Sequence, residues 1–151
     1  MQTELKIRPA VASDLARACD WLQAAGLPAA DLTPQHMLDF LFAERGGLPV
    51  GMVGLEPFAP PARIGLLRSL VVDPSCRGGG LGSRLVAALE AAAVERGLRE
   101  LWLLTIDAQE FFARRAYVAA ARSAAPSVIQ ASAEFTSLCP GDAVLMCKRL
   151  A

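Results

Sequence analysis

The chain has 151 residues, which is enough for one hydrophobic core and too few for two, so we expect a single domain spanning 1–151. The charges of its 15 basic and 15 acidic side chains cancel, so the composition does not predict a surface that binds nucleic acid. Charged residues and glycines interrupt every apolar run before it could cross a bilayer, and the first residues lack the layout of a secretory signal. We therefore expect a cytoplasmic protein that binds neither membrane nor nucleic acid.

The cysteines argue against metal and disulfide chemistry. They are widely separated along the chain, at Cys19, Cys76, Cys139 and Cys147. The sequence has no C-x-x-C pair and one histidine, His36. Because structural zinc sites and disulfide frameworks depend on such clustered ligands, we expect no bound metal.

The N-terminal part predicts a strand, two helices and a hairpin. The expected elements are a strand at Leu5–Arg8, a helix from the cap Ser13 through Ala25, a short helix from Pro34 to about Leu38, and strands at Phe40–Glu44 and Leu48–Glu56. Gly26 is expected to close the first helix, and Thr33 to cap the second. Because Arg45-Gly46-Gly47 supplies turn residues, the two strands are expected to pair antiparallel.

The C-terminal part predicts two parallel strands joined by a helix. The almost continuous apolar run Ile64–Val72 is typical of a strand buried on both faces. The elements expected after it are a helix at Leu81–Arg96 closed by Gly97, a strand at Leu101–Thr105, a short helix at Ala108–Arg115, and a last strand at Ala143–Arg149. A strand, a crossover helix and a second strand make a parallel unit, so the order predicts an α/β domain with a mixed sheet and helices on its faces.

The most informative segment is the glycine loop, residues 77–83, between the central strand and the long helix. Glycines let backbone N–H groups approach an anion, and the first turn of a helix has free donors, so the loop predicts a phosphate-bearing ligand. A P-loop is excluded because no lysine follows the glycines. A dinucleotide site is a weaker alternative, since Gly78-x-Gly80-x-x-Ser83 nearly matches its motif and Asp107 could contact a ribose. A purely structural turn is the other alternative.

The spacing Arg-x-x-Gly-x-Gly at residues 77–82, after the strand end Ser69–Pro74, resembles the GNAT family of acetyl-CoA-dependent N-acetyltransferases. The resemblance extends from Ile7 to Ala113. It implies a mixed, mostly antiparallel sheet with a splayed central parallel pair, and acetyl-CoA as co-substrate. It also implies that the pantetheine arm pairs with Leu70, Val71 and Val72, and that the pyrophosphate lies on Arg77, Gly78, Gly79, Gly80, Leu81, Gly82 and Ser83.

Acetylation of an amine needs a deprotonated nucleophile, so a carboxylate base is a reasonable component of the site. Glu56, at the end of a hairpin strand beside the central strand, is the first candidate, although it could equally be an exposed strand-end acid. Glu134 is the second candidate, because it lies in the segment expected to border the substrate pocket. It is also expected to bind the substrate.

The family often has a tyrosine as general acid in the helix after the second parallel strand. In this chain Phe112 stands at that position, and Tyr117 falls where the family has a core aromatic. Either the thiolate leaves without such an acid, or Ser137 or Cys139 replaces it. A core role for Tyr117 is the more favoured one.

Arg68 places a permanent charge in an apolar strand. A buried arginine needs a partner, so it either pairs with a carboxylate of the protein or points at an anionic substrate. In the second case Arg68 or Arg8 would clamp the acid group of an amino acid. Pairing within the protein is the slightly favoured alternative.

Together these features predict direct transfer of acetyl from acetyl-CoA to a primary amine of a small molecule. The tail Ser137–Gly141, together with Leu67–Leu70, resembles a branch of the family associated with arsenic-resistance operons, which implies an amino acid or a toxic amino-acid analogue as acceptor. The alternative is an acyl-CoA-binding sensor without turnover. The alanine-rich, apolar C-terminal third is compatible with a homodimer.

Overall fold

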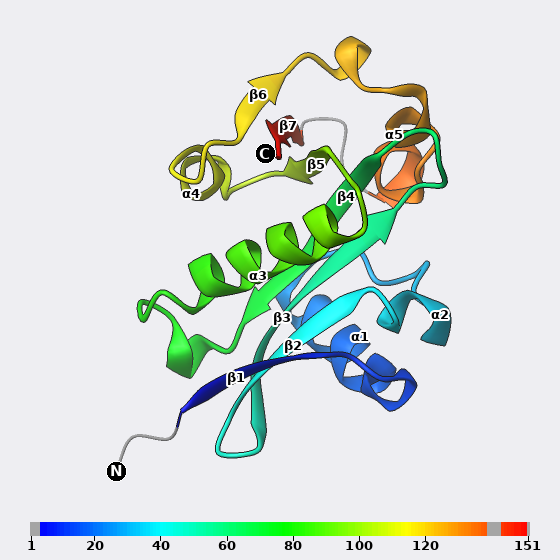
Figure 1. The fold of residues 1–151 in the computed structure, drawn as a ribbon. Helices are drawn as coiled ribbons and strands as arrows, with labels where there is room; N and C mark the ends of the chain where they lie inside the picture. Colours follow the sequence, from blue (N-terminus) through cyan, green and yellow to red (C-terminus); the bar gives the residue numbers. More distant parts are fainter. Residues whose placement is uncertain (1–3, 139–142, 151) are drawn as a thin grey trace.

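A computed structural model describes residues 4–138 and 143–150 of the chain (Figure 1). Within these ranges one seven-stranded sheet has the order β1-β2-β3-β4-β5-β7-β6. The strands are β1 (Leu5–Pro9), β2 (Phe40–Arg45), β3 (Leu48–Pro57), β4 (Ile64–Val72), β5 (Glu100–Thr105), β6 (Val118–Ala120) and β7 (Val144–Arg149). The pair β4 and β5 is parallel and the other neighbouring strands are antiparallel, so the predicted α/β class and mixed sheet are confirmed.

Helices cover both faces of this sheet (Figure 1). They are α1 (Leu15–Ala25), α2 (Pro34–Met37), α3 (Leu81–Glu95), α4 (Gln109–Ala113) and α5 (Ser127–Gln130). The long helix α3 lies on one face, and α1 and α2 lie on the other (Figure 1). In the described part of the chain, no helix combines the length and the apolar character that crossing a membrane requires.

The alternation of side chains along the strands explains the two-sided core. Ala43 and Val53 belong to the cluster that packs against α3, whereas their neighbours Phe42 and Met52 pack with α1 and α2 on the opposite face. Successive residues of a strand point to opposite faces, so apolar residues at every position need cover on both sides. The nearly continuous apolar strands therefore account for helices on each side of the sheet.

Three details differ from the sequence prediction. The first helix begins at Leu15, because residues 12–14 form a 3-10 turn in which Asp14 accepts a hydrogen bond from the Val11 N–H, so Ser13 is not its cap. The helix α3 ends at Glu95, and Gly97, with a φ of 82°, lies beyond its cap. A further strand was expected before the last one, but its bounds, here those of β6, were not predicted, and neither was the helix α5, because alanine dominates that stretch and hides any periodicity.

The parallel pair separates soon after it forms. Ile64, Gly65 and Leu66 pair with Glu100, Leu101 and Trp102, and no later residue of β4 pairs with β5. The rest of β4, Leu67–Val72, therefore runs away from its neighbour. The splayed central pair implied by the family resemblance is present, and it opens a wedge in the middle of the sheet.

Gly54 is a position where the packing of the sheet can be tested. A Cβ atom there would overlap the ring of Phe40 on the neighbouring strand β2, and both residues lie in the buried sheet. We expect Gly54→Ala to lower the free energy of unfolding by about 1–3 kcal/mol, as overpacking does, in urea denaturation. The control Gly79→Ala adds a Cβ whose nearest neighbour is 3.8 Å away, so it should change stability by less than about 1 kcal/mol. Equal effects of the two substitutions would contradict this account of the core.

Candidate active site

The glycine loop presents free backbone donors at the start of α3. Gly78 and Gly80 have φ angles of 88° and 78°, in the left-handed region that favours glycine. Gly80 is the N-cap of the helix, and its position supplies no side-chain hydrogen bond to the first turn. The loop from Arg77 to Gly80 is exposed. The N–H groups of the first helical turn are therefore open to an anion, and the positive end of the helix dipole favours one.

Arg115, which the sequence analysis did not single out, stands beside this helix start. Its guanidinium donates to the Phe111 carbonyl at 2.6 Å, donates also to Ser83 Oγ, and lies 3.6 Å from the centroid of the Phe111 ring. The buried Arg115 Nε has no hydrogen-bond partner among the described residues. A fixed positive charge is therefore held next to the first turn of α3. Arg114, Arg115 and Arg122 lie close together in the sequence, but nothing in the sequence places Arg115 beside α3.

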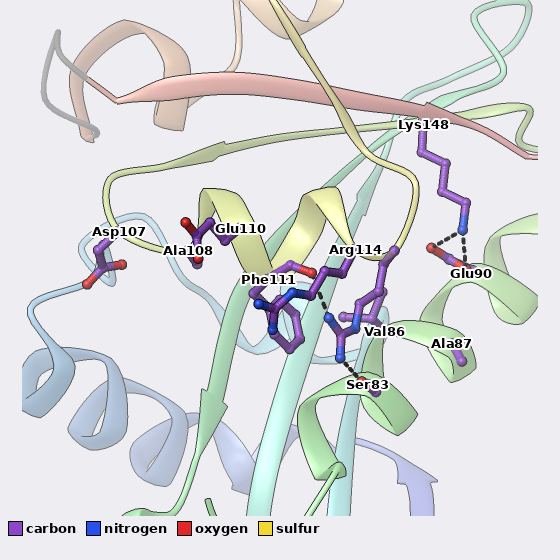
Figure 2. A pocket seen from close by; sticks show the side chains of 11 residues that line it. Ser83, Val86, Ala87, Glu90, Asp107, Ala108, Glu110, Phe111, Arg114 and Lys148 are labelled. Carbon is purple, nitrogen blue, oxygen red and sulfur yellow. Dashed lines mark hydrogen bonds and ion pairs between the residues drawn. The ribbon is translucent and has the colours of Figure 1, made fainter. Parts of the chain in front are cut away.

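Three cavities lie in series across the sheet. The first, which we call the α3-side cavity, has a volume of about 630 Å³ and lies between α3 and α4, with Ser83, Phe111 and Arg114 on its walls (Figure 2). The second, the wedge cavity of about 120 Å³, is lined by the separated parts of β4 and β5. The third, the α1-side cavity of about 400 Å³, is lined by the end of α1 and by Glu134.

Shared wall residues connect these cavities. Asp107 and Ala108 line both the α3-side cavity and the wedge cavity. Arg68, Ser69 and Thr105 line both the wedge cavity and the α1-side cavity. The opening between β4 and β5 thus connects one face of the sheet with the other. Two ligands entering from opposite faces could meet there.

The strand β4 carries a bulge at this opening. Gly54 pairs with Arg68 and Met52 pairs with Val71, so one more residue is present on β4 than on β3 between these pairs. Ser69 has a φ of 60°, a left-handed conformation that a non-glycine residue rarely adopts. Because a bulge takes a residue out of the ladder, it leaves backbone groups of Ser69–Leu70 available to a ligand in the wedge.

Arg68 is the centre of a buried ion cluster. Its side chain is 0 % exposed, and it donates to both carboxylate oxygens of Asp31, at 2.6 and 2.8 Å, and to Glu56 at 3.1 Å. Its Nε lies 3.3 Å from both Ser69 Oγ and Glu134 Oε1. Pairing within the protein is thus what the structure shows, and it engages more carboxylates than the sequence analysis expected. Asp31 was not foreseen as a partner.

The cluster shifts the pKa values of its members in opposite directions. Burial favours the neutral form of Asp31, but the hydrogen bonds and charge of Arg68 outweigh it and hold the pKa of Asp31 below its usual range. Burial dominates at Glu134, and together with the charges of Asp31 and Glu56 it outweighs Arg68, raising the pKa of Glu134 to about 7. Glu134 is therefore a carboxyl group poised to take or release a proton near neutral pH.

Of the other charged residues predicted for the site, Glu134 lines a cavity, whereas Arg8 and Glu56 do not line the α1-side cavity. Arg8 is bound by Asp14 at 2.9 Å and Glu44 at 3.0 Å, and it does not line the α1-side cavity. Glu56 is held by Arg68, and it lines none of the three cavities described above. Glu134 does line the α1-side cavity.

Phe112 and Tyr117 lie in the core, and the candidate residues of the tail are described only in part. Phe112 is buried and lines the wedge cavity. Tyr117 is buried and donates to Glu90 at 2.9 Å, and burial with the nearby Glu90 charge raises its pKa, in agreement with a core role. The backbone of Ser137 belongs to the π-helical turn Glu134–Leu138, whereas its side chain and Cys139 lie outside the described part of the chain.

Comparison with known proteins identifies the family. Residues 10–120 match the family model described as the acetyltransferase (GNAT) family. This chain belongs to the GNAT family. The family predicted from the glycine loop is thus confirmed, and its match includes the central strand, the loop and α3.

Amino-acid acetyltransferases are among the relatives of this GNAT chain. Those of Ectopseudomonas mendocina and Azotobacter vinelandii are 34 % and 36 % identical to it over 87 and 78 residues. These matches cover 58 % and 52 % of this chain but 20 % and 18 % of the relatives. The chain therefore aligns with about a fifth of the length of the curated relatives it matches.

Solved structures share the fold. The N-acetylglutamate synthase of Neisseria gonorrhoeae, complexed with coenzyme A and N-acetyl-glutamate, superposes with a TM-score of 0.84 at 24 % identity, over 100 % of this chain and 36 % of that one. A Mycobacterium tuberculosis protein in complex with CoA gives 0.80 at 22 % identity, over 97 % and 99 % of the two chains.

The raised pKa of Glu134 predicts a pH-dependent cost in stability. The folded protein binds this proton more tightly than the unfolded chain, so the stabilisation is present at low pH and is lost as pH rises through about 7. We expect Glu134→Gln to raise the free energy of unfolding at pH 8.5 by about 3 kcal/mol, with most of the gain gone by pH 5, in urea denaturation. Glu56→Gln, which removes a partner of Arg68, should show no such gain. A destabilised Glu134→Gln at pH 8.5 would contradict the electrostatic account.

Proposed function

We propose that this chain is a single-domain N-acetyltransferase that transfers acetyl from acetyl-CoA directly to a primary amine of a small molecule. The observation that carries the proposal is the series of cavities through the splayed sheet, with a loop of free backbone donors on one face and a buried carboxyl group on the other. Membership of the GNAT family supports the same reaction.

The glycine loop and the strand β4 would bind different parts of acetyl-CoA. The pyrophosphate would lie on residues 77–83, where free N–H groups and the charge of Arg115 favour an anion. The pantetheine arm carries amides that can hydrogen-bond as an added strand, and residues 70–72 lie on the part of β4 that no longer pairs with β5. The thioester would then enter the wedge beside the bulge at Ser69.

The bulge and Glu134 supply the chemistry. A backbone N–H of Ser69–Leu70 would stabilise the oxyanion that forms when the amine attacks the thioester carbon. The new C–N bond forms, the C–S bond breaks, and the proton of the amine passes to Glu134. The sulfur leaves as a thiolate; free thiols have a pKa of about 8.5, so departure needs no dedicated acid and fits the phenylalanine at position 112.

Glu134 is a better base than Glu56 in this geometry. Glu134 lines the cavity that the acceptor would occupy, whereas Glu56 accepts a hydrogen bond from Arg68 and lies outside that cavity. A base works best when its pKa lies near the operating pH, and the pKa of Glu134 is about 7. We therefore assign the proton transfer to Glu134.

The acceptor is proposed to be an amino acid or a related amine. The relatives named amino-acid acetyltransferases support this class. The resemblance to an arsenic-resistance branch supports including toxic amino-acid analogues in a screen. Release of free CoA with such amines distinguishes the enzyme from an acyl-CoA-binding sensor, which would bind the cofactor and release nothing. We further propose a cytoplasmic location and a homodimer, the latter on the apolar C-terminal third.

Cofactor binding can be tested at Gly79, where a side chain has room. We expect saturating acetyl-CoA to stabilise the protein by about 2.7 kcal/mol at a hundredfold excess over Kd, seen as a rise in Tm, and NAD to have no effect. Gly79→Glu places a negative charge in the loop and should weaken acetyl-CoA binding at least tenfold in calorimetry. The matched Gly79→Gln should bind within a fewfold of the native protein. Equal affinity of both variants would remove the loop from the pyrophosphate site.

The assignment of the base can be tested by pH profiles. We expect Glu134→Gln to lower kcat/KM by about 10²–10⁴-fold and to lose the rise in activity centred near pH 7 that deprotonation of Glu134 gives the native enzyme. Glu56→Gln should keep that rise even if its activity falls. A Glu134→Gln variant with the native profile would exclude Glu134 as the base.

A further inference from the structure

The wall of the α1-side cavity carries an excess of negative charge. Among the residues that the structure describes, the charged ones that line it are Arg68, Asp107 and Glu134. Asp31 and Glu56 lie directly behind, on the guanidinium of Arg68. One cation thus faces four carboxyl groups, and the field in this cavity favours a positive ligand.

Arg68 is not available to an acidic ligand. Each of its three nitrogen atoms is already within hydrogen-bond distance of a partner, and its side chain has no exposed surface. To clamp a substrate carboxylate with two donors, it would have to release either Asp31, whose two oxygens it holds as a bidentate pair, or Ser69 and Glu134 at its Nε. Either release would leave a buried or half-buried carboxyl group without its cation.

No other basic side chain takes its place. All 15 lysines and arginines fall within residues 4–138 and 143–150, since the remaining positions hold none. Arg114, Arg115 and Lys148 line the α3-side cavity, on the other face of the sheet. Arg122 donates to the carbonyls of Phe135 and Ala143 and does not line the α1-side cavity.

The helix α1 adds to the same field. Its last residue, Ala25, and its C-cap Gly26 line the α1-side cavity. The C-terminal end of a helix carries a partial negative charge, which favours cations and disfavours anions. The helix and the carboxylates are independent sources of negative potential that act on one cavity.

We propose that the α1-side cavity selects acceptors by charge: it accepts amines whose side chains are neutral or cationic, and it rejects those with a second acid group, such as glutamate. This inference rests on the proposed acetyl transfer, since it assigns the acceptor class of the same site. The acceptor is drawn to the carboxylates as an ammonium, it reacts in its deprotonated form, and the proton that it loses as the C–N bond forms passes to Glu134. Every carboxylate of an acceptor meets like charges and no free guanidinium, so an acceptor with a second acid group meets this repulsion twice and one with a neutral side chain meets it once.

The experiment compares acceptors that differ by one charge. Steady-state CoA release is measured with glutamate and glutamine, with aspartate and asparagine, and with lysine and its uncharged side-chain isosteres. We expect kcat/KM for each amide to exceed that for its acid at least tenfold, with a ratio that shrinks as salt is raised. An acid used as well as its amide would overturn the charge selection. Failure to release CoA with every amine tried would instead overturn the proposed enzyme, and with it this inference.

Two variants locate the selecting charges. Asp107→Asn removes an exposed carboxylate that lines the cavity. It should reduce the ratio of kcat/KM for an amide to kcat/KM for its acid about threefold or more. Asp31→Asn frees donors of Arg68 and should raise the relative use of the acid further, provided that its Tm shows a folded protein. The control Glu95→Gln, at the far end of α3, should leave the ratio unchanged. Ratios that respond equally to Asp107→Asn and Glu95→Gln would contradict the assignment.

Discussion

The buried guanidinium of Arg68 is the constraint on which the site depends. A charge without exposed surface must be neutralised inside the protein, and here the carboxylates come from the loop before α2, from β3 and from the π-helical turn Glu134–Leu138. Each of these segments is thereby tied to the central strand β4. The same contacts shape one wall of the α1-side cavity, because Arg68 and Glu134 line it directly. Removing the arginine would therefore affect the folding of the wall and the electrostatics of the cavity together.

The bulge next to Arg68 explains why the sheet opens at this point. An extra residue in β4 bends the strand and increases its local twist, and the parallel pairing with β5 has already ended at Leu66. Ser69 accepts an unfavourable backbone conformation there, held in place by a sheet that pairs on both sides of it. One short stretch of β4 therefore contains the end of the parallel pairing at Leu66, the centre of the ion cluster at Arg68, and the bulge with its free backbone groups at Ser69.

The parts that sequence predicts best are those whose signals are local. The strand Ile64–Val72, the glycine loop and α3 follow one another directly, so their residues could be read together as an anion site. The partners of Arg68 could not be found in this way. Asp31 is 37 positions from it in the chain, and only the folded sheet brings the two together. Arg115 was likewise invisible as a loop residue, because its contact with Ser83 spans 32 positions. The alanine-rich stretch after Val118 has too little contrast between apolar and polar residues to predict α5 or the turn that carries Glu134.

Glu134 connects stability with the proposed chemistry. Its burial costs free energy above neutral pH, because the protein holds a carboxylate that its surroundings favour in the protonated form. A core selected for stability alone would replace it with an uncharged residue. The charge of Arg68 does not fully offset the free energy of burying the Glu134 carboxylate, because Asp31 and Glu56 also pair with Arg68. The arrangement that leaves one carboxyl group with too little positive charge is also the one that gives the cavity a proton acceptor near neutral pH and a surplus of negative charge. Proton transfer and acceptor choice would then have a common electrostatic origin.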